Sequence, residues 1–187
     1  MNSKRIFLAI ELPEHVIQGA EKVKKEIEST GEDIKLVDKR NFHINVFFFG
    51  TVSDDMLEAI KTAVTSTVRS FHTFDITVKG SGVFLNEKSP RVLWLGVESP
   101  ELIFFQAELK KKFAGLGFNT GEKKYKPHIT LGRVRSFKNK SSFLTILKKY
   151  TSHVFGTFKS DKIVLFESTL SPDGPEYKKV LEFKIGD

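Results

Sequence analysis

The chain of 187 residues carries 30 Lys and Arg against 23 Asp and Glu, a net charge of +7, and 40% of its residues are hydrophobic. This length and composition suit a globular protein with a sizeable core and exclude a disordered chain. The absence of cysteine excludes disulfide scaffolds, thiolate zinc sites and cysteine nucleophiles.

The first half of the chain predicts two helices set between strands. Apolar residues recur at helical spacing from Val16 to Ile27, after Pro13, a residue that suits the start of a helix. Ser53 is a candidate N-cap, because its hydroxyl can accept a hydrogen bond from the first turn of a helix. The elements expected here are a strand over 5–10, a helix from Pro13 that ends before Gly31, a strand over 42–49, a helix over 54–68 and a strand over 75–79.

The second half begins with the same order of elements. Gly80-Ser81-Gly82 indicates a tight turn after the strand. Ser99 and Pro100 then form an N-cap followed by an early proline. The elements expected here are a strand over 91–97, a helix from 100 to about 115, a strand over 128–134, a helix over 140–150, and strands over 155–158, 162–166 and 177–185, with a turn at 172–175.

The two halves share a short motif that begins with histidine. His43-Ile44-Asn45-Val46 opens one expected strand, and His128-Ile129-Thr130-Leu131 opens another 85 positions later. Duplicated modules commonly pack about a pseudo-twofold axis, which would place the two histidines opposite each other. No segment resembles a flexible linker, so we expect residues 1–187 to form a single two-lobed domain.

Alternate residues of a strand point to the same face, so each histidine shares a face with the polar residue two positions on. Imidazole titrates near neutral pH, so one ring can accept a proton while the other donates one. This pairing favours metal-independent cleavage of a phosphodiester. A metal site is disfavoured, because neither motif has a carboxylate or second histidine at ligand spacing. The remaining histidines are expected to be structural or surface residues: His15, His72 and His153.

Several segments, taken in order, resemble one known family. They are Arg5–Ile10 with Leu12-Pro13, Asn41 to Gly50, Gly80 to Asn86, Pro90 to Trp94, Lys126 to Arg133, and the tail from Ser168 to Tyr177. The chain resembles the RNA 2′,3′-cyclic phosphodiesterases, also called 2′-5′ RNA ligases, of the two-histidine phosphoesterase superfamily. The resemblance implies an α+β fold of two lobes, with antiparallel sheets lining a central cleft.

The resemblance also implies a reaction and roles for residues. An RNA 2′,3′-cyclic phosphate would be hydrolysed to a 2′-phosphate, with His43 as the general acid toward the departing 3′ oxygen and His128 as the base that activates water. Thr130 would bind a phosphate oxygen, and Arg133 would clamp the phosphate. Asn45 stands where the family usually has Thr or Ser, although its amide still donates hydrogen bonds.

Two of the implied site residues conflict with simple strand alternation. Alternation places Arg133 on the face opposite His128. A bulge, a twisted strand end or the length of the side chain must therefore bring the guanidinium to the face of His128. Phe48, which matches a family aromatic near the base or ribose, has the same conflict. For Phe48, a place in the core and a place in the site are both left open.

The implied partner is RNA with a 2′,3′-cyclic phosphate end, tRNA-like fragments included, and no cofactor is implied. We expect a monomer in the cytoplasm without membrane contact, because the chain shows no signal peptide and no apolar run near the roughly 20 residues of a membrane span. Two alternatives remain: 2′-5′ RNA ligation at the same site, and a non-catalytic RNA-binding module in which Asn45 has weakened catalysis.

Overall fold

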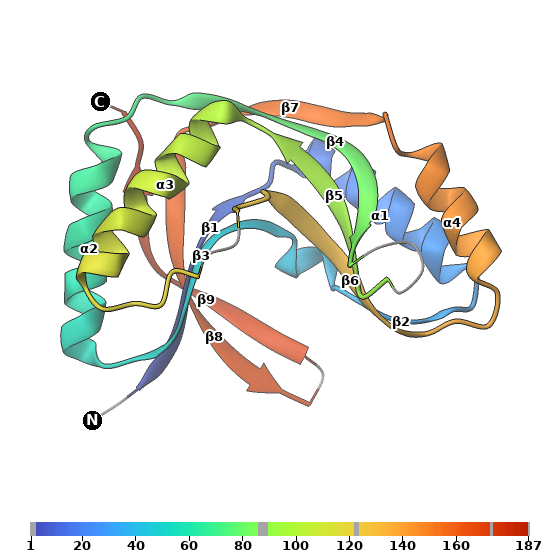
Figure 1. The fold of residues 1–187 in the computed structure, drawn as a ribbon, viewed down its shortest axis with the longest axis horizontal. Coiled ribbons are helices and arrows are strands. Elements are labelled where there is room, and N and C mark those ends of the chain that lie inside the picture. The colour runs from blue at the N-terminus through green and yellow to red at the C-terminus, as the bar shows by residue number, and fades with distance from the viewer. Residues whose placement is uncertain (1–2, 86–89, 122–123, 173, 187) are drawn as a thin grey trace.

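A computed structural model describes residues 3–85, 90–121, 124–172 and 174–186, which form helices around an antiparallel sheet (Figure 1). Within these ranges no helix is long and apolar enough to cross a membrane. The elements are β1 (Lys4–Glu11), α1 (Glu14–Glu28), β2 (Asp33–Leu36), a 3-10 turn (Lys39–Asn41), β3 (His43–Val52), α2 (Asp54–Val68), β4 (Phe74–Phe84), β5 (Val92–Glu98), α3 (Pro100–Gly115), β6 (His128–Ser136), α4 (Lys140–Lys149), β7 (Val154–Ser160), β8 (Lys162–Ser171) and β9 (Gly174–Lys184).

One nine-stranded sheet joins the two halves of the chain. Its strand order is β7-β4-β5-β6-β3-β1-β8-β9, and β2 pairs with β6 beside this path. At the centre, β3 and β6 pair antiparallel with Ile44 opposite Ile129, residues 85 positions apart. An antiparallel pair has a local twofold axis between its strands. The axis between Ile44 and Ile129 therefore relates the two histidine motifs, and the predicted α+β class with a pseudo-twofold arrangement is confirmed, in one continuous sheet.

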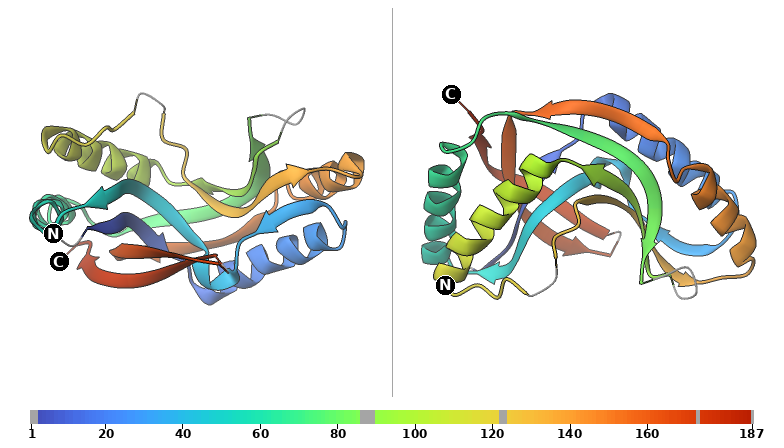
Figure 2. Two further views of the ribbon diagram at one scale, coloured as in Figure 1. Left: turned by 90° about the horizontal axis from the view of Figure 1, so that it is seen from below. Right: turned by 45° about the horizontal axis from the view of Figure 1, so that its top comes forward.

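The helices pack on one face of this sheet. Figures 1 and 2 show α2 beside α3 at one end of the molecule and α1 beside α4 at the other. Their buried residues join one core with inward residues of the central strands, such as Ile6, Ile44 and Ile129. On the opposite face, Phe7 and Ala9 of β1 form a separate small cluster with residues of β8. We call this second face, which carries the two histidines, the open face.

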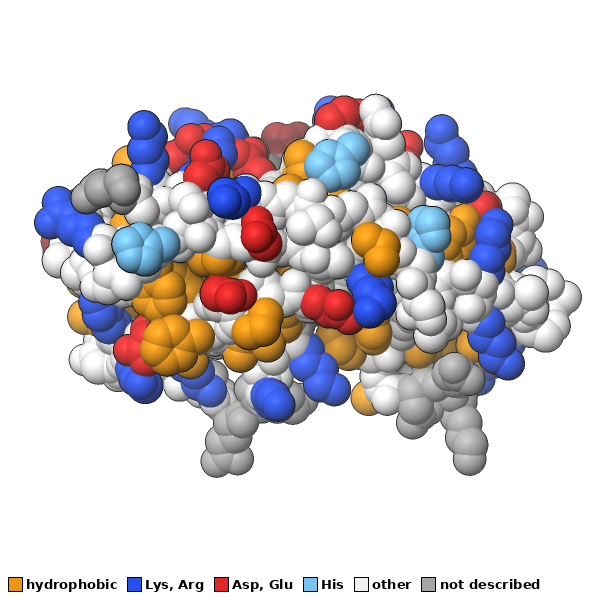
Figure 3. All heavy atoms as spheres, turned by 90° about the horizontal axis from the view of Figure 1, so that it is seen from above, with side chains coloured by type: hydrophobic (Ala, Val, Ile, Leu, Met, Phe, Trp, Pro, Cys, Tyr) orange, Lys and Arg blue, Asp and Glu red, His pale blue; other side chains and the backbone are white. Residues whose placement is uncertain are grey.

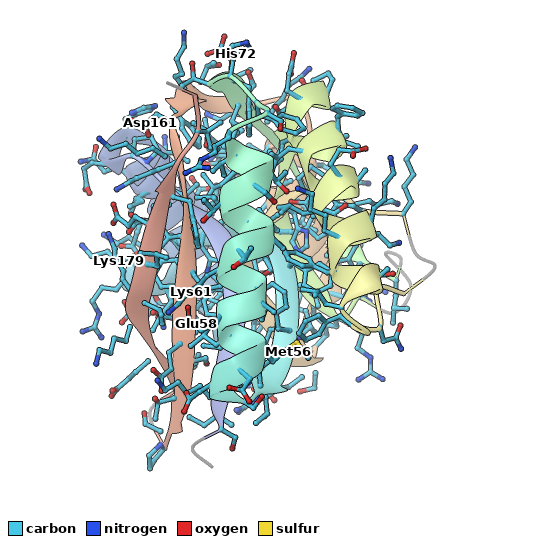
Figure 4. All side chains as sticks on the ribbon, turned by 90° about the vertical axis from the view of Figure 1, so that its left-hand side faces the viewer. Met56, Glu58, Lys61, His72, Asp161 and Lys179 are labelled. Carbon is cyan, nitrogen blue, oxygen red and sulfur yellow. The ribbon has the colours of Figure 1, made fainter. Side chains whose placement is uncertain are left out.

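Local sequence signals set the helix ends. The Ser53 hydroxyl accepts a hydrogen bond from the Met56 amide, and the Ser99 hydroxyl accepts one from the Leu102 amide, as expected of N-caps. Pro13 itself occupies the N-cap of α1 and precedes the first helical residue. Along the outer side of α2, Glu58 and Lys61 form an ion pair of 2.7 Å (Figure 4).

Two sequence predictions about turns are wrong. Gly80-Ser81-Gly82 lies inside β4, where the register against β5 slips between Val78 and Ser81. Gly80 has a φ of +76°, so glycine marks a bulge in a strand here and not the end of one. The expected turn at 172–175 is shorter, because Gly174 and Pro175 already belong to β9, and Asp173 lies outside the described residues. Asn86 also lies outside them.

Candidate active site

His43 and His128 open the two central strands and lie on the open face. Their neighbours Ile44 and Ile129 are fully buried in the core on the other face, which fixes the direction of each imidazole. Asn45 and Thr130 follow on the open face, each partly exposed. The structure thus brings together both predicted proton-transfer residues and their polar partners.

Each histidine is oriented by a carbonyl of its own segment. His43 Nδ1 lies 2.7 Å from the Asn41 carbonyl oxygen, and His128 Nδ1 lies 2.7 Å from the Lys126 carbonyl oxygen. A carbonyl oxygen only accepts hydrogen bonds, so Nδ1 carries hydrogen in both rings. Nε2 is therefore the nitrogen left to gain or lose a proton on each side.

Aromatic rings hold the two imidazoles from the side. His43 contacts Phe7 at 5.1 Å between ring centroids and meets the edge of Tyr177 at 5.5 Å. His128 meets Phe84 edge-on at 4.7 Å. Tyr177 and Phe84 come from β9 and β4, so strands distant from the motifs complete the support on each side.

Burial changes the proton affinity of both rings. It lowers the pKa of His43 and of His128 below the ordinary value of 6.5, while the carbonyl hydrogen bonds act in the opposite direction. The positive charge of His128 lowers the pKa of His43 further, so the two rings lie close enough to affect each other's charge. At neutral pH both are neutral in the free protein, and an anion between them would favour protonation.

A bulge in each central strand brings the two disputed residues to the open face. On β3, Asn45 pairs with Ala9 and Phe47 with Leu8, which leaves Val46 as the extra residue. Phe48 then pairs with Phe7 and is 49% exposed, so it does not belong to the core.

On β6, Thr130 pairs with Trp94 and Gly132 with Leu93, which leaves Leu131 as the extra residue. Leu131 and Gly132 are both buried, and Arg133 is exposed on the same face as Thr130. Phe48 and Arg133 are again 85 positions apart, so the twin bulges place an aromatic ring and a cation at equivalent points of the two halves.

Sequence reasoning missed three side chains at this face. The Tyr125 hydroxyl donates a hydrogen bond of 2.9 Å to the Asn45 carbonyl, which ties the entry of β6 to β3. Tyr177 packs against His43, and the Arg5 guanidinium lies 5.0 Å from the centroid of the Phe48 ring. These contacts span from 43 to 134 positions of sequence, and no local pattern of residues announces them.

Other features of the described residues lie away from the histidines. The described residues form no group of three or more His, Cys, Asp or Glu that could hold a metal ion. A cavity of about 240 Å³ at the C-terminal end of β6 is lined by Arg91, Arg135 and Lys140, among others, and includes neither site histidine. The three histidines predicted to be structural or surface residues are all exposed: His15, His72 and His153.

Comparison with known proteins gives concordant matches over nearly the whole chain. The family model described as the AKAP7 2′5′ RNA ligase-like domain matches residues 6–185. A protein of Methanocaldococcus jannaschii named RNA 2′,3′-cyclic phosphodiesterase is 36% identical over 96% of this chain and 99% of its own length. One of the same name from Methanothermobacter thermautotrophicus is 32% identical over 97% of this chain and 98% of its own. A solved structure from Thermus thermophilus has a TM-score of 0.84 at 24% identity and covers 98% of this chain and 99% of that chain.

Proposed function

The chain belongs to the 2′-5′ RNA ligase-like family, and we propose on this basis that it hydrolyses RNA 2′,3′-cyclic phosphate ends to 2′-phosphates. The observation that carries the proposal is the symmetric pair of imidazoles on the open face. Each has its Nδ1 engaged by a backbone carbonyl, so each presents Nε2 for proton transfer. No metal or cofactor takes part in the proposed reaction.

The two histidines divide the proton transfers between them. His128 Nε2 takes a proton from water, and the water oxygen forms a bond to phosphorus. The bond from phosphorus to the 3′ oxygen breaks, and the protonated His43 Nε2 gives its proton to that oxygen. The products are a 2′-phosphate and a free 3′-hydroxyl, so one water molecule is consumed and the protons balance.

The negative charge of the substrate supports the required protonation state. Burial keeps His128 neutral at neutral pH, as a base must be, but it also disfavours the protonated form of His43. An anionic phosphate between the rings opposes this effect, because a nearby negative charge raises the pKa of an imidazole. The acid is thereby charged when substrate is present.

Polar groups beside the histidines suit the phosphoryl oxygens. Thr130 and Asn45 follow the two rings on the open face and can donate hydrogen bonds from a hydroxyl and an amide. The bulge in β6 turns Arg133 toward the same face, where its guanidinium can balance developing charge. Phe48, exposed at the matching bulge of β3, offers a flat apolar surface to the base or ribose.

The remaining elements of the proposal concern the whole molecule. One sheet runs through both halves, which supports residues 1–187 acting as a single two-lobed domain. The substrates are RNA ends that carry the cyclic phosphate, with tRNA-like fragments among them. A monomer in the cytoplasm suits this role, and a chain without cysteine suits a reducing compartment.

Turnover of a cyclic phosphate end in EDTA tests the proposal. The wild-type protein should convert an oligonucleotide 2′,3′-cyclic phosphate to the 2′-phosphate, and His43→Ala or His128→Ala should each slow this by about 10²- to 10⁴-fold. His72→Ala, at an exposed loop position after α2 (Figure 4), is the matched control and should retain full activity. Persistence of the cyclic end with the wild-type protein, or equal activity of all variants, would contradict the proposal. When a second RNA with a 5′-hydroxyl end is added to the same reaction, a joined product in the product analysis indicates ligation.

A further inference from the structure

Two arginines on the open face have no carboxylate partner within the described ranges. Arg5 and Arg133 are exposed, and neither forms an ion pair or a hydrogen bond with Asp or Glu there. Two lysines of the neighbouring strands are neutralised instead: Lys162 of β8 and Lys179 of β9 both pair with Glu11 and Glu182. Cations and carboxylates are also interspersed on the surface seen in Figure 3. The open face therefore retains positive charge that the protein itself does not balance.

Strand register shows where Arg5 stands. Alternation along β1 places it on the same face as Phe7, and its guanidinium lies over Phe48, which is opposite Phe7 on β3. Glu11, which pairs with His43, is six strand positions away, or about 20 Å along β1. Arg5 lies two positions beyond Phe7, whose ring contacts His43, so its guanidinium extends the open face past that imidazole.

Tyr177 connects Arg5 with the histidines. Its ring meets Phe7 at 4.8 Å and His43 at 5.5 Å between centroids, and its hydroxyl has no hydrogen-bond partner among the described residues. Burial raises the pKa of Tyr177, and the charges of Arg5 and Arg133 lower it. Both guanidinium groups are therefore close enough to act on this hydroxyl, although they come from opposite halves of the chain.

We propose that Arg5 and Tyr177, faced by Arg133, form a second anion site that holds the phosphodiester on the 5′ side of the terminal nucleotide. The inference rests on the proposed function, since it extends the same substrate along the open face. A guanidinium and a phenol offer the donors that two phosphate oxygens accept. The protein therefore acts on RNA chains in preference to cyclic mononucleotides, and Arg5 sets this preference.

The test compares a cyclic mononucleotide with a tetranucleotide that ends in the same cyclic nucleotide. Arg5→Ala should lower kcat/KM for the tetranucleotide by about 10-fold, the discrimination of one charged contact, and change the value for the mononucleotide less than about 2-fold. Tyr177→Phe should act in the same direction with a smaller effect. Arg69→Ala removes the same charge from the end of α2 and should leave both substrates unchanged.

Salt dependence separates a phosphate contact from stacking. For RNA binding followed by fluorescence anisotropy, Arg5→Ala should reduce the slope of log K against log salt by about 0.7, the value for one phosphate on a single strand. Arg5→Lys keeps the charge and should keep the slope. An equal loss on both substrates, no loss on the tetranucleotide, or a slope altered equally by Ala and Lys would overturn the inference. Anisotropy measures binding and needs no turnover. If the protein binds RNA without hydrolysing it, the proposed function is contradicted, but the salt dependence still decides whether Arg5 contacts a phosphate.

Discussion

The hydrogen bond from Tyr125 to the Asn45 carbonyl predicts a specific effect of Tyr125→Phe. The ring still packs against the main core, and only the hydroxyl that reaches across from the entry of β6 to β3 is lost. Near the two motifs, β3 and β6 are paired through Ile44 and Ile129. The hydrogen bond from Tyr125 to the Asn45 carbonyl is therefore a major polar link between these two strands.

The magnitude follows from the type of bond. A neutral hydrogen bond of 2.9 Å contributes about 0.5–1.5 kcal/mol, and this one is only partly buried. We expect a loss of about 1 kcal/mol in the free energy of unfolding, equivalent to a fall of about 2–4 °C in Tm for a chain of this size. Because misplacement of catalytic groups by a fraction of an ångström is costly, kcat should fall by about 3- to 10-fold.

Tyr150→Phe is the matched control for this experiment. It also removes one tyrosine hydroxyl, whose 2.6 Å hydrogen bond to Glu26 joins α4 to α1 on the other side of the sheet. Thermal unfolding should show a loss for both variants, whereas steady-state kinetics on a cyclic phosphate should show a fall in kcat for Tyr125→Phe alone. An unchanged Tm and kcat for Tyr125→Phe, or equal falls in kcat for both variants, would refute the reasoning.

Two further predictions concern pH and backbone contact. Burial lowers the pKa of both histidines below 6.5, so the proposed acid His43 loses its proton below that pH in the free enzyme. Because kcat/KM reports the free enzyme, it should already be falling as the pH rises through 6.5. A pH–rate profile that stays level through neutral pH would contradict the lowered pKa values. Gly96 is the residue opposite His128, and Gly96→Ala would place a Cβ atom 2.5 Å from the Lys79 carbonyl oxygen. Urea unfolding should show that this variant loses about 2 kcal/mol or more of the free energy of unfolding. Gly115→Ala, with no atom within 4 Å of the new Cβ, should be neutral or slightly stabilising, and equal losses in the two variants would argue against the contact.

The sequence predicts features whose causes are local. The N-caps Ser53 and Ser99 act on amides three residues away, and the two histidine strands show their alternation within four residues. The equivalence of His43 and His128 was visible as a repeat, and the direct pairing of Ile44 with Ile129 gives it a physical basis. The α+β class and the family were implied by the resemblance of several segments, two of which carry these histidine motifs.

Features set by pairing between distant strands could not be predicted in the same way. The sequence does not mark Val46 or Leu131 as extra residues, because a bulge is defined only against the neighbouring strand. β2 was missed, since it has only four residues and lies beside β6 at the margin of the sheet. Arg5 and Tyr177 belong to strands that meet the histidines only through the sheet order.

The local origin of the imidazole orientation has a consequence for how such a site can arise. In each half, the carbonyl that fixes Nδ1 lies only two residues before the histidine, so a short segment contains both the ring and its orientation. Repeating that segment repeats the imidazole together with the carbonyl that orients it, while the aromatic rings beside each imidazole come from other strands. Two copies aligned antiparallel about the Ile44 and Ile129 pair place two imidazoles, each with its Nδ1 engaged, on one surface. A paired-imidazole site of this kind therefore needs only one short segment used twice, and the two halves differ in the side chains at equivalent positions, Asn45 against Thr130 and Phe48 against Arg133.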